Sequence, residues 1–230
     1  MGVFETAIGW LAPPQCIGCD IEGTALCEAC STSEIVAYGE RCYLCGAVAP
    51  GGRTCPSCRP GSPRFVWIST NYEGPAKDLV KLYKFRHQRA AASTLAQLMN
   101  QTMLDFNTKA DVARTDYLVV PVPTATSRIR QRSFDHSTLL ARALAKKLGL
   151  KEAAVLGRLG QSRQLGAPRS TRLKQADGQY YVRLPHLVKG RNILLIDDVV
   201  TTGATIKAVT KQLRRAGARR IDALVFAKRL

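Results

Sequence analysis

Acidic residues are scarce in this chain of 230 residues, and cysteine is missing from most of it. Lys and Arg number 34 against 17 Asp and Glu, which gives a formal net charge of +17. All 8 cysteines lie within residues 16–58. No run of 18 apolar residues occurs, which argues against a membrane-spanning helix. The first residues have no basic stretch ahead of their short apolar one, so we expect no secretory signal and a cytoplasmic protein.

Two common nucleotide-binding motifs are also absent. There is no G-x-x-x-x-G-K-[ST], which argues against a P-loop, and no G-x-G-x-x-G, which argues against a dinucleotide-binding fold. The excess of positive charge is confined to one part of the chain. Residues 1–60 hold three Arg and six acids, a net charge of −3, so residues 61–230 carry +20. Such a surface attracts polyanions, whether nucleic acid, diphosphates or an acidic membrane.

The cysteines form four C-x-x-C pairs, a spacing that lets both thiolates of a pair reach one tetrahedral Zn²⁺. The pairs are Cys16/Cys19, Cys27/Cys30, Cys42/Cys45 and Cys55/Cys58. They predict two Cys₄ zinc sites. A disulfide framework is the alternative, but a reducing cytosol disfavours it. Sequential pairing of the knuckles is preferred, and interleaved pairing stays open. A closed Cys₄ site has no open position for substrate, so we expect a structural or binding role.

The composition changes after the cysteine module, and we place a boundary there: a double zinc ribbon over 1–60 and a second domain over 61–230. In that domain strands and helices alternate, which predicts a mainly parallel α/β sheet flanked by helices. Expected strands are 65–72, 116–122, 153–159, 180–184, 192–196 and 221–226, the last one closing the sheet. Expected helices are 76–86, 89–106, 135–148 and 204–216, with Gly149 ending the third. Residues 160–178 read as a long polar loop, either a hood over a site or a solvated segment.

One run, residues 193–205, carries most of the chemistry. Ile193–Ile196 reads as a buried parallel strand, and Asp197 and Asp198 follow at its carboxyl end, where open α/β sheets bind ligands. Carboxylates accept hydrogen bonds from a vicinal diol. The polar residues 201–205 then lead into a helix whose N-terminus favours a phosphate. Gly203 allows close approach of the backbone. A Walker B strand and an ordinary strand-turn-helix are the alternatives.

This run resembles the phosphoribosyl-diphosphate (PRPP) fingerprint of type I phosphoribosyltransferases. The resemblance implies that the two acids hold the ribose hydroxyls and that the following loop holds the 5′-phosphate. The implied PRPP-binding residues are Asp197, Asp198, Val199, Thr201, Thr202, Gly203, Ala204 and Thr205. The implied pyrophosphate loop is Pro121, Val122, Pro123 and Thr124. Mg²⁺ is expected to accompany PRPP.

Nearly the whole chain resembles the ComF family, which joins a double zinc ribbon to a phosphoribosyltransferase-like domain. The likeness extends to residues 11–16, to the basic-aromatic segment 81–86 and to the loop 119–123. Two segments depart from the family pattern: Ser133, Asp135 and His136 replace Gly, Asn and Gln in one, and Gln175 and Tyr180 replace Asn and Phe in the other. Basic or flexible-loop residues implied near the ligand are Arg128, Arg130, Arg132, Gln164, Arg169, Arg172 and Lys174.

Two classes of function follow. The first is a phosphoribosyltransferase with PRPP, Mg²⁺ and an unknown acceptor, for which Asp135 and His136 are the candidate bases. The second, implied by the family resemblance, is a non-catalytic protein of natural transformation that binds single-stranded DNA and acts with the DNA-uptake machinery. Basic side chains that alternate with aromatic ones suit such a ligand. A PRPP- or nucleotide-sensing regulator is a third interpretation.

Overall fold

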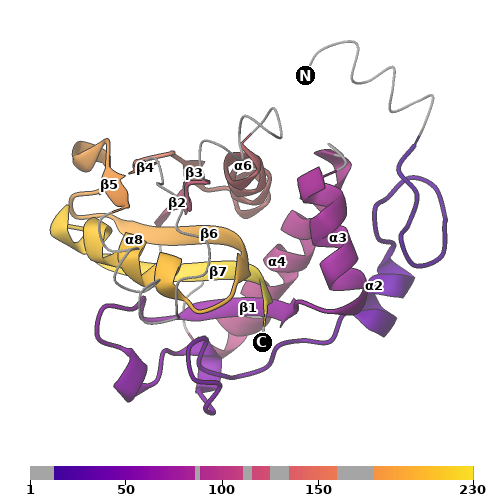
Figure 1. Ribbon diagram of the computed structural model, residues 1–230, viewed down its shortest axis with the longest axis horizontal. Helices are drawn as coiled ribbons and strands as arrows, with labels where there is room; N and C mark the ends of the chain where they lie inside the picture. The colour runs from indigo at the N-terminus through magenta and orange to yellow at the C-terminus, as the bar shows by residue number, and fades with distance from the viewer. Residues whose placement is uncertain (1–12, 86–88, 111–115, 125–134, 160–178, 230) are drawn as a thin grey trace, which may run out of the picture.

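The computed structural model describes residues 13–85, 89–110, 116–124, 135–159 and 179–229. Its centre is a five-stranded parallel sheet with the strand order β1-β7-β6-β2-β3 (Figure 1). The strands are β1 (Val66–Asn71), β2 (Tyr117–Pro121), β3 (Lys151–Glu152), β6 (Asn192–Val200) and β7 (Arg220–Lys228). The expected parallel α/β sheet is therefore confirmed.

The two longest strands, β6 and β7, lie inside the sheet because their side chains are apolar on both faces. Residues Ile193–Ile196 of β6 are fully buried, and so are Ala223–Ala227 of β7. Parallel strands that are covered on both faces carry such continuous apolar runs. The expectation that residues 221–226 close the sheet is wrong, since β7 lies between β1 and β6. A strand buried on both faces belongs in the interior of a sheet rather than at its edge.

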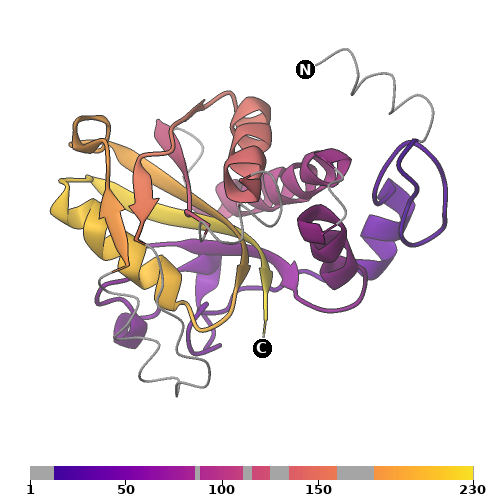
Figure 2. The ribbon, with the colours of Figure 1, turned by 45° about the horizontal axis from the view of Figure 1, so that its top comes forward.

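Helices cover both faces of the sheet (Figures 1 and 2). Helices α3 (Gly74–Phe85), α4 (Arg89–Ala110) and α6 (His136–Leu148) share one core, and α8 (Ala204–Arg215) belongs to the other. Helix α6 ends where the sequence predicts, because Gly149 follows it in the left-handed conformation at φ 66°. Within the ranges given above, no helix is both long and apolar enough to cross a membrane.

Two expected strands do not join the parallel sheet. Residues 153–159 and 180–184 give only β4 (Leu156–Arg158) and β5 (Tyr180–Val182), which pair with each other in antiparallel fashion. The parallel sheet ends at the two-residue strand β3, which offers too short an edge for a further strand. This pairing requires glycine at position 157, because a Cβ there would lie 2.4 Å from the ring of Tyr181. A single 3₁₀ turn, η4 (Pro185–Leu187), leads from this hairpin towards β6.

The cysteine-rich segment contains α2 (Glu28–Glu34) and the 3₁₀ turns η1 (Pro50–Gly52) and η2 (Pro56–Cys58). It packs against both faces of the sheet: Leu26 and Cys30 belong to the core under α3 and α4, whereas Tyr38 and Tyr43 belong to the core under α8. The indole N–H of Trp67 in β1 donates to the backbone oxygen of Gly51 at 3.1 Å. The segment is thus docked along the sheet, and a domain boundary at residue 60 stays a prediction.

Candidate functional site

A polar cavity of about 370 Å³ lies at the carboxyl ends of the parallel strands, the edge at which open α/β sheets bind ligands. Its wall is formed by residues of β6, by residues that follow β1, β2 and β7, by helices α3, α6 and α8, and by the β4–β5 hairpin. The lining residues are Tyr72, Lys84, Val122, Pro123, Thr124, His136, Ser137, Arg158, Tyr180, Asp197, Asp198, Val199, Thr201, Thr205 and Arg229. We call this cavity the carboxyl-edge pocket.

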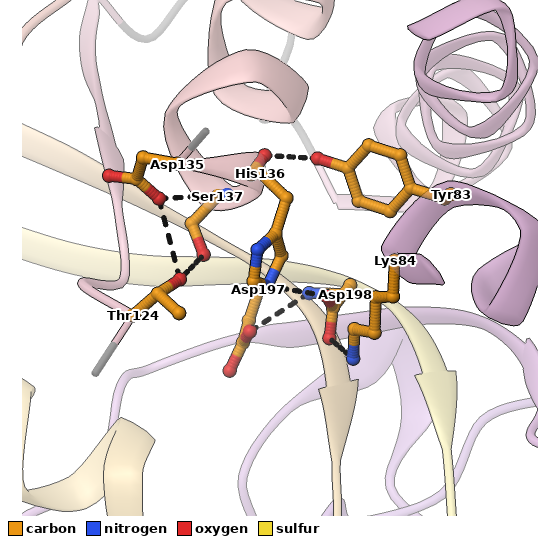
Figure 3. Close-up of polar contacts among 8 residues, drawn as sticks. All are labelled: Tyr83, Lys84, Thr124, Asp135, His136, Ser137, Asp197 and Asp198. Atoms are coloured by element: carbon orange, nitrogen blue, oxygen red, sulfur yellow. Dashed lines mark hydrogen bonds and ion pairs between the residues drawn. The ribbon is translucent and has the colours of Figure 1, made fainter. Parts of the chain in front are cut away.

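The two adjacent carboxylates of β6 have different partners (Figure 3). Asp198 is buried, and its Oδ1 lies 2.6 Å from the Nζ of Lys84 on α3. Its Oδ2 lies 3.6 Å from the Nε2 of His136 on α6. Asp197 Oδ1 accepts a hydrogen bond from the backbone N–H of Asp198 at 2.9 Å. The protein itself therefore balances the charge of Asp198, while Asp197 has only this backbone contact within the described part of the chain.

The environment of Asp197 disfavours its charged form. Burial, and after it the neighbouring charge of Asp198, raise the pKa of Asp197 to about 7, although Lys84 and the backbone hydrogen bond act to lower it. His136, Arg158 and Arg229 face the same pocket. A carboxyl with this pKa changes charge near neutral pH, so a ligand that brings hydroxyl groups or positive charge can bind its ionised form.

The start of helix α6 and the loop after β2 are held together by hydrogen bonds. Asp135 caps the helix, since its side chain accepts from the N–H of Ser137 at 3.2 Å and from Thr138 Oγ1 at 2.8 Å. Thr124 Oγ1 lies 2.8 Å from Ser137 Oγ, and Tyr83 donates to the backbone oxygen of His136. Asp135 does not line the pocket, whereas His136 does. The carboxylate of Asp135 is thus engaged in capping.

The loop between β6 and α8 brings Thr201 and Thr205 to the pocket, with Gly203 as the N-cap of the helix. Gly203 has φ 74°, a conformation that favours glycine. A Cβ at this position would lie 2.4 Å from Leu44 and 2.7 Å from Tyr43. The space beside the glycine is therefore filled by a knuckle of the second cysteine cluster, a reason for glycine that the sequence did not reveal. Of the other expected PRPP-binding residues, Thr202 and Ala204 do not line the pocket.

Several pocket residues were missed by reasoning from the sequence. Lys84 stands in the basic-aromatic segment 81–86, and that segment was the one signal for it. Arg229 directly follows β7, so its position at the carboxyl end of a strand could have identified it, as it identified Asp197 and Asp198. Arg158 lies on β4, and its Nε has no hydrogen-bond partner among the described residues. Outside the described residues lie the expected Arg128, Arg130, Arg132, Gln164, Arg169, Arg172 and Lys174. Pro121 ends β2 and does not line the pocket, although Val122, Pro123 and Thr124 do.

The eight thiols gather in two groups in sequence order, and in each group the sulfur atoms lie within 4.8 Å of one another. The first group is Cys16, Cys19, Cys27 and Cys30, and the second is Cys42, Cys45, Cys55 and Cys58. Two of the sulfur–sulfur distances are 3.7 and 3.6 Å. Zn–S bonds of about 2.3 Å in a tetrahedron give edges of about 3.8 Å, so both clusters are compatible with structural zinc.

Each cluster holds one thiol that ionises readily. Burial acts to raise the pKa of Cys16, but hydrogen bonds from the N–H groups of Cys27, at 3.3 Å, and Gly18, at 3.4 Å, outweigh it and lower that pKa to about 6. The pKa of Cys42 is lowered to about 7 in the same manner. One thiolate per cluster is thus available to a cation at neutral pH.

Comparison with known proteins now adds to this geometry. The family model described as "Phosphoribosyl transferase domain" matches residues 135–230. The "DNA utilization protein YhgH" of Salmonella typhi is 28% identical over 224 residues, which covers 89% of this chain and 97% of that protein. The "Competence protein ComFC" of Bacillus subtilis is 25% identical over 202 residues, covering 84% of this chain and 79% of that protein.

The expected resemblance to the ComF family is confirmed by these relatives, by the phosphoribosyl transferase domain match and by the two Cys₄ clusters. The fold of the chain is that of a type I phosphoribosyltransferase, a parallel sheet flanked by helices, joined to two N-terminal Cys₄ clusters. Among solved structures, that of "the allosteric regulatory enzyme of purine biosynthesis" matches with a TM-score of 0.43 and 16% identity. The match covers 63% of this chain and only 29% of that enzyme.

Proposed function

We propose that the carboxyl-edge pocket binds PRPP, or the phosphoribosyl part of a nucleotide. One observation carries the proposal: the two carboxylates of β6 and the N-terminus of α8 meet at a single cavity, where a sugar and its phosphate can be bound together. Helix N-termini favour phosphate, because their backbone N–H groups have no partner within the helix. The cations of Lys84, Arg158 and Arg229 around the same cavity add to the attraction for a diphosphate.

In this proposal the two acids have separate tasks. Asp197 accepts the ribose hydroxyls, and Asp198 fixes Lys84 in the wall of the pocket through the 2.6 Å ion pair. Thr201 and Thr205 face the 5′-phosphate, and residues 122–124 face the diphosphate. These placements follow the strand-end geometry and remain to be tested by substitution.

The side chains present fit Mg²⁺ only in part. Mg²⁺ takes oxygen ligands and often binds through one or two carboxylates together with substrate phosphates. Asp197 fits such a role, whereas Asp198 already lies against Lys84 and His136. When bound with PRPP, Mg²⁺ would neutralise part of the diphosphate charge. The residues of this chain would supply one carboxylate and the surrounding cations.

The proposal leaves two readings of the chemistry. As a transferase, the protein would break the bond between the ribose C1′ and the diphosphate oxygen, and a bond from C1′ to an acceptor would replace it. As a sensor, it would bind the same ligand without reaction. His136 lines the pocket and is the candidate for proton transfer, and its Nε2 lies 3.6 Å from Asp198 Oδ2. Its role as a general base stays a prediction.

We further propose that the protein handles single-stranded DNA in the cytoplasm, in contact with DNA-uptake machinery. The names of the relatives, "DNA utilization protein" and "Competence protein", support this proposal. The net charge of +20 over residues 61–230 supports it too, because such a charge attracts a polyanion. The two cysteine clusters would each hold one structural Zn²⁺, which suits a reducing compartment.

Calorimetric titration with PRPP and Mg²⁺ tests the donor site. Asp197→Asn should weaken binding about tenfold or more, because it removes a charged acceptor of the ribose hydroxyls. Asp78→Asn is the matched control, since Asp78 is an exposed acid on α3 that pairs with Lys81 at 2.9 Å. Equal affinities of the two variants, or no binding by the zinc-loaded protein, would contradict the proposal. Release of pyrophosphate with a panel of acceptors then separates the transferase from the sensor.

A further inference from the structure

A second cavity lies at the opposite, amino edge of the parallel sheet. Its volume is about 670 Å³, and its wall is formed where β6 and β7 begin, at the C-terminal end of α8, and just before β1 and β2. Four arginines line it: Arg64, Arg214, Arg219 and Arg220. Strands β6 and β7 are each nine residues long, so about 30 Å of sheet separates this amino-edge pocket from the carboxyl-edge pocket.

A buried carboxylate orients one of these arginines. Asp222 is completely buried, and its Oδ2 accepts from Arg220 Nε at 2.5 Å and from the Tyr117 hydroxyl at 2.6 Å. Its Oδ1 accepts from the backbone N–H of Phe65 at 2.9 Å. The guanidinium of Arg220 also lies 5.5 Å from the centre of the Phe65 ring. Arg220 is therefore fixed in one direction at the wall of the cavity, as a built binding site requires.

Positive charge at this edge exceeds the negative charge that the protein supplies. Arg214 donates to the backbone oxygen of Ser62 at 2.5 Å, and the Arg64 guanidinium lies 5.3 Å from the centre of the Phe65 ring. The acid that lines the cavity, Asp116, pairs with Arg191 at 3.6 Å. Among the described residues, none of Arg64, Arg214 and Arg219 forms an ion pair with a carboxylate. An anion in the cavity would relieve their mutual repulsion.

We propose that the amino-edge pocket is a second anion site, one that binds phosphate groups. Guanidinium groups match phosphate oxygens in pairs, which is why arginine is preferred where phosphate is bound with defined geometry. The two aromatic rings beside these arginines, Phe65 and Tyr117, are only 3% and 2% exposed. The site therefore offers charge and hydrogen bonds but no open ring on which a base could stack. It suits a sugar-phosphate backbone or a free phosphate, read without regard to sequence.

This inference gives the DNA-handling part of the proposed function a place in the structure, and it is independent of the PRPP site. A fluorescent thymidine oligonucleotide of about 20 residues is the first probe, measured by anisotropy across a range of salt concentrations. Arg64→Gln/Arg219→Gln should weaken binding about tenfold near 0.1 M salt. The slope of log K against log salt should fall by about 1.4, since each lost contact with single-stranded DNA accounts for about 0.7.

Two further variants show whether the arginines act as a site or as diffuse charge. Lys146→Gln/Lys147→Gln removes the same charge from exposed positions on α6, which packs on the opposite face of the sheet from α8. That pair should leave affinity nearly unchanged. Arg64→Lys/Arg219→Lys keeps the charge but loses the planar fork, so it should weaken binding by an intermediate factor. If Arg64→Gln/Arg219→Gln and Lys146→Gln/Lys147→Gln weakened binding equally, the proposal would be overturned.

Competition distinguishes the two sources of phosphate. If inorganic pyrophosphate displaces the oligonucleotide from the wild type with an affinity that Arg64→Gln/Arg219→Gln reduces, the pocket takes small phosphates as well as a strand. If pyrophosphate fails to compete and the oligonucleotide is still sensitive to the arginines, the pocket takes the strand alone. If the affinities for pyrophosphate and for the oligonucleotide are both unchanged in the arginine variants, the proposal is overturned. Asp197→Asn should weaken PRPP binding and leave oligonucleotide binding unchanged, so the proposal for each site can be refuted without the other.

Discussion

Replacement of Gly203 by alanine tests whether the second cysteine cluster really packs against the loop between β6 and α8. The substitution puts a side chain at φ 74°, which costs about 1–2 kcal/mol for a left-handed residue. The new Cβ would lie 2.4 Å from Leu44 and 2.7 Å from Tyr43, so the knuckle or the loop must move. Overpacking of this kind costs about 1–3 kcal/mol. We expect Gly203→Ala to lower the free energy of unfolding by about 2–5 kcal/mol in urea titrations of the zinc-loaded protein.

Gly149 provides the matched control, because it ends α6 at φ 66° with no heavy atom within 4 Å of a built Cβ. Gly149→Ala should therefore show the conformational cost alone, about 1–2 kcal/mol. Adding Leu44→Ala to Gly203→Ala should recover about 1 kcal/mol or more, because the nearest colliding atom is removed. If the two glycine variants were equally unstable and Leu44→Ala gave no recovery, the contact between knuckle and loop would not exist in solution.

Three further outcomes follow from the site. Asp197→Asn should raise the free energy of unfolding by about 2–4 kcal/mol at pH 8 in Mg²⁺-free buffer, because the pKa of Asp197 is raised from 3.8 to about 7. This gain in stability should shrink as the pH falls below 7 and should vanish near pH 4, which urea titrations at pH 8 and pH 4 would show. Lys84→Met should cost about 3 kcal/mol by leaving buried Asp198 without its cation. Lys81→Met, at an exposed pair, should leave stability nearly unchanged. A zinc chelator should lower the thermal midpoint by about 5 °C or more, followed by circular dichroism, and added zinc should restore it.

The sequence predicts those features that depend on local patterns. The apolar run Ile193–Ile196 specifies a central strand wherever it occurs, and the position of Asp197 at the end of that run places it at the ligand-binding edge. Gly149 stops a helix through its own backbone conformation. The C-x-x-C spacing holds the two thiols of a pair together, and the short loops of 7 and 9 residues between neighbouring pairs favour the sequential order that the clusters follow.

Features that depend on the meeting of distant segments were not predictable in this way. Lys84 and Asp198 are 114 residues apart, and nothing local to either one indicates that they form an ion pair. The pairing of β4 with β5, away from the main sheet, depends on the short edge at β3 and on the close approach of Tyr181 to Gly157. The arginines of the amino-edge pocket come from positions 64 and 214–220, so their convergence appears only in the folded sheet.

The two cysteine clusters support opposite walls of the carboxyl-edge pocket. The first cluster belongs to the core that holds α3, and α2 lies beside α3 in both views of the chain (Figures 1 and 2), so this side carries Lys84 to Asp198. The second cluster places Tyr43 and Leu44 against Gly203, at the N-terminus of α8. Metal bound in the two clusters would add to the folding energy that this segment gains from packing against both cores. Loss of metal from the first cluster should therefore disturb the ion pair between Lys84 and Asp198. Loss of metal from the second should disturb the loop between β6 and α8, at Gly203.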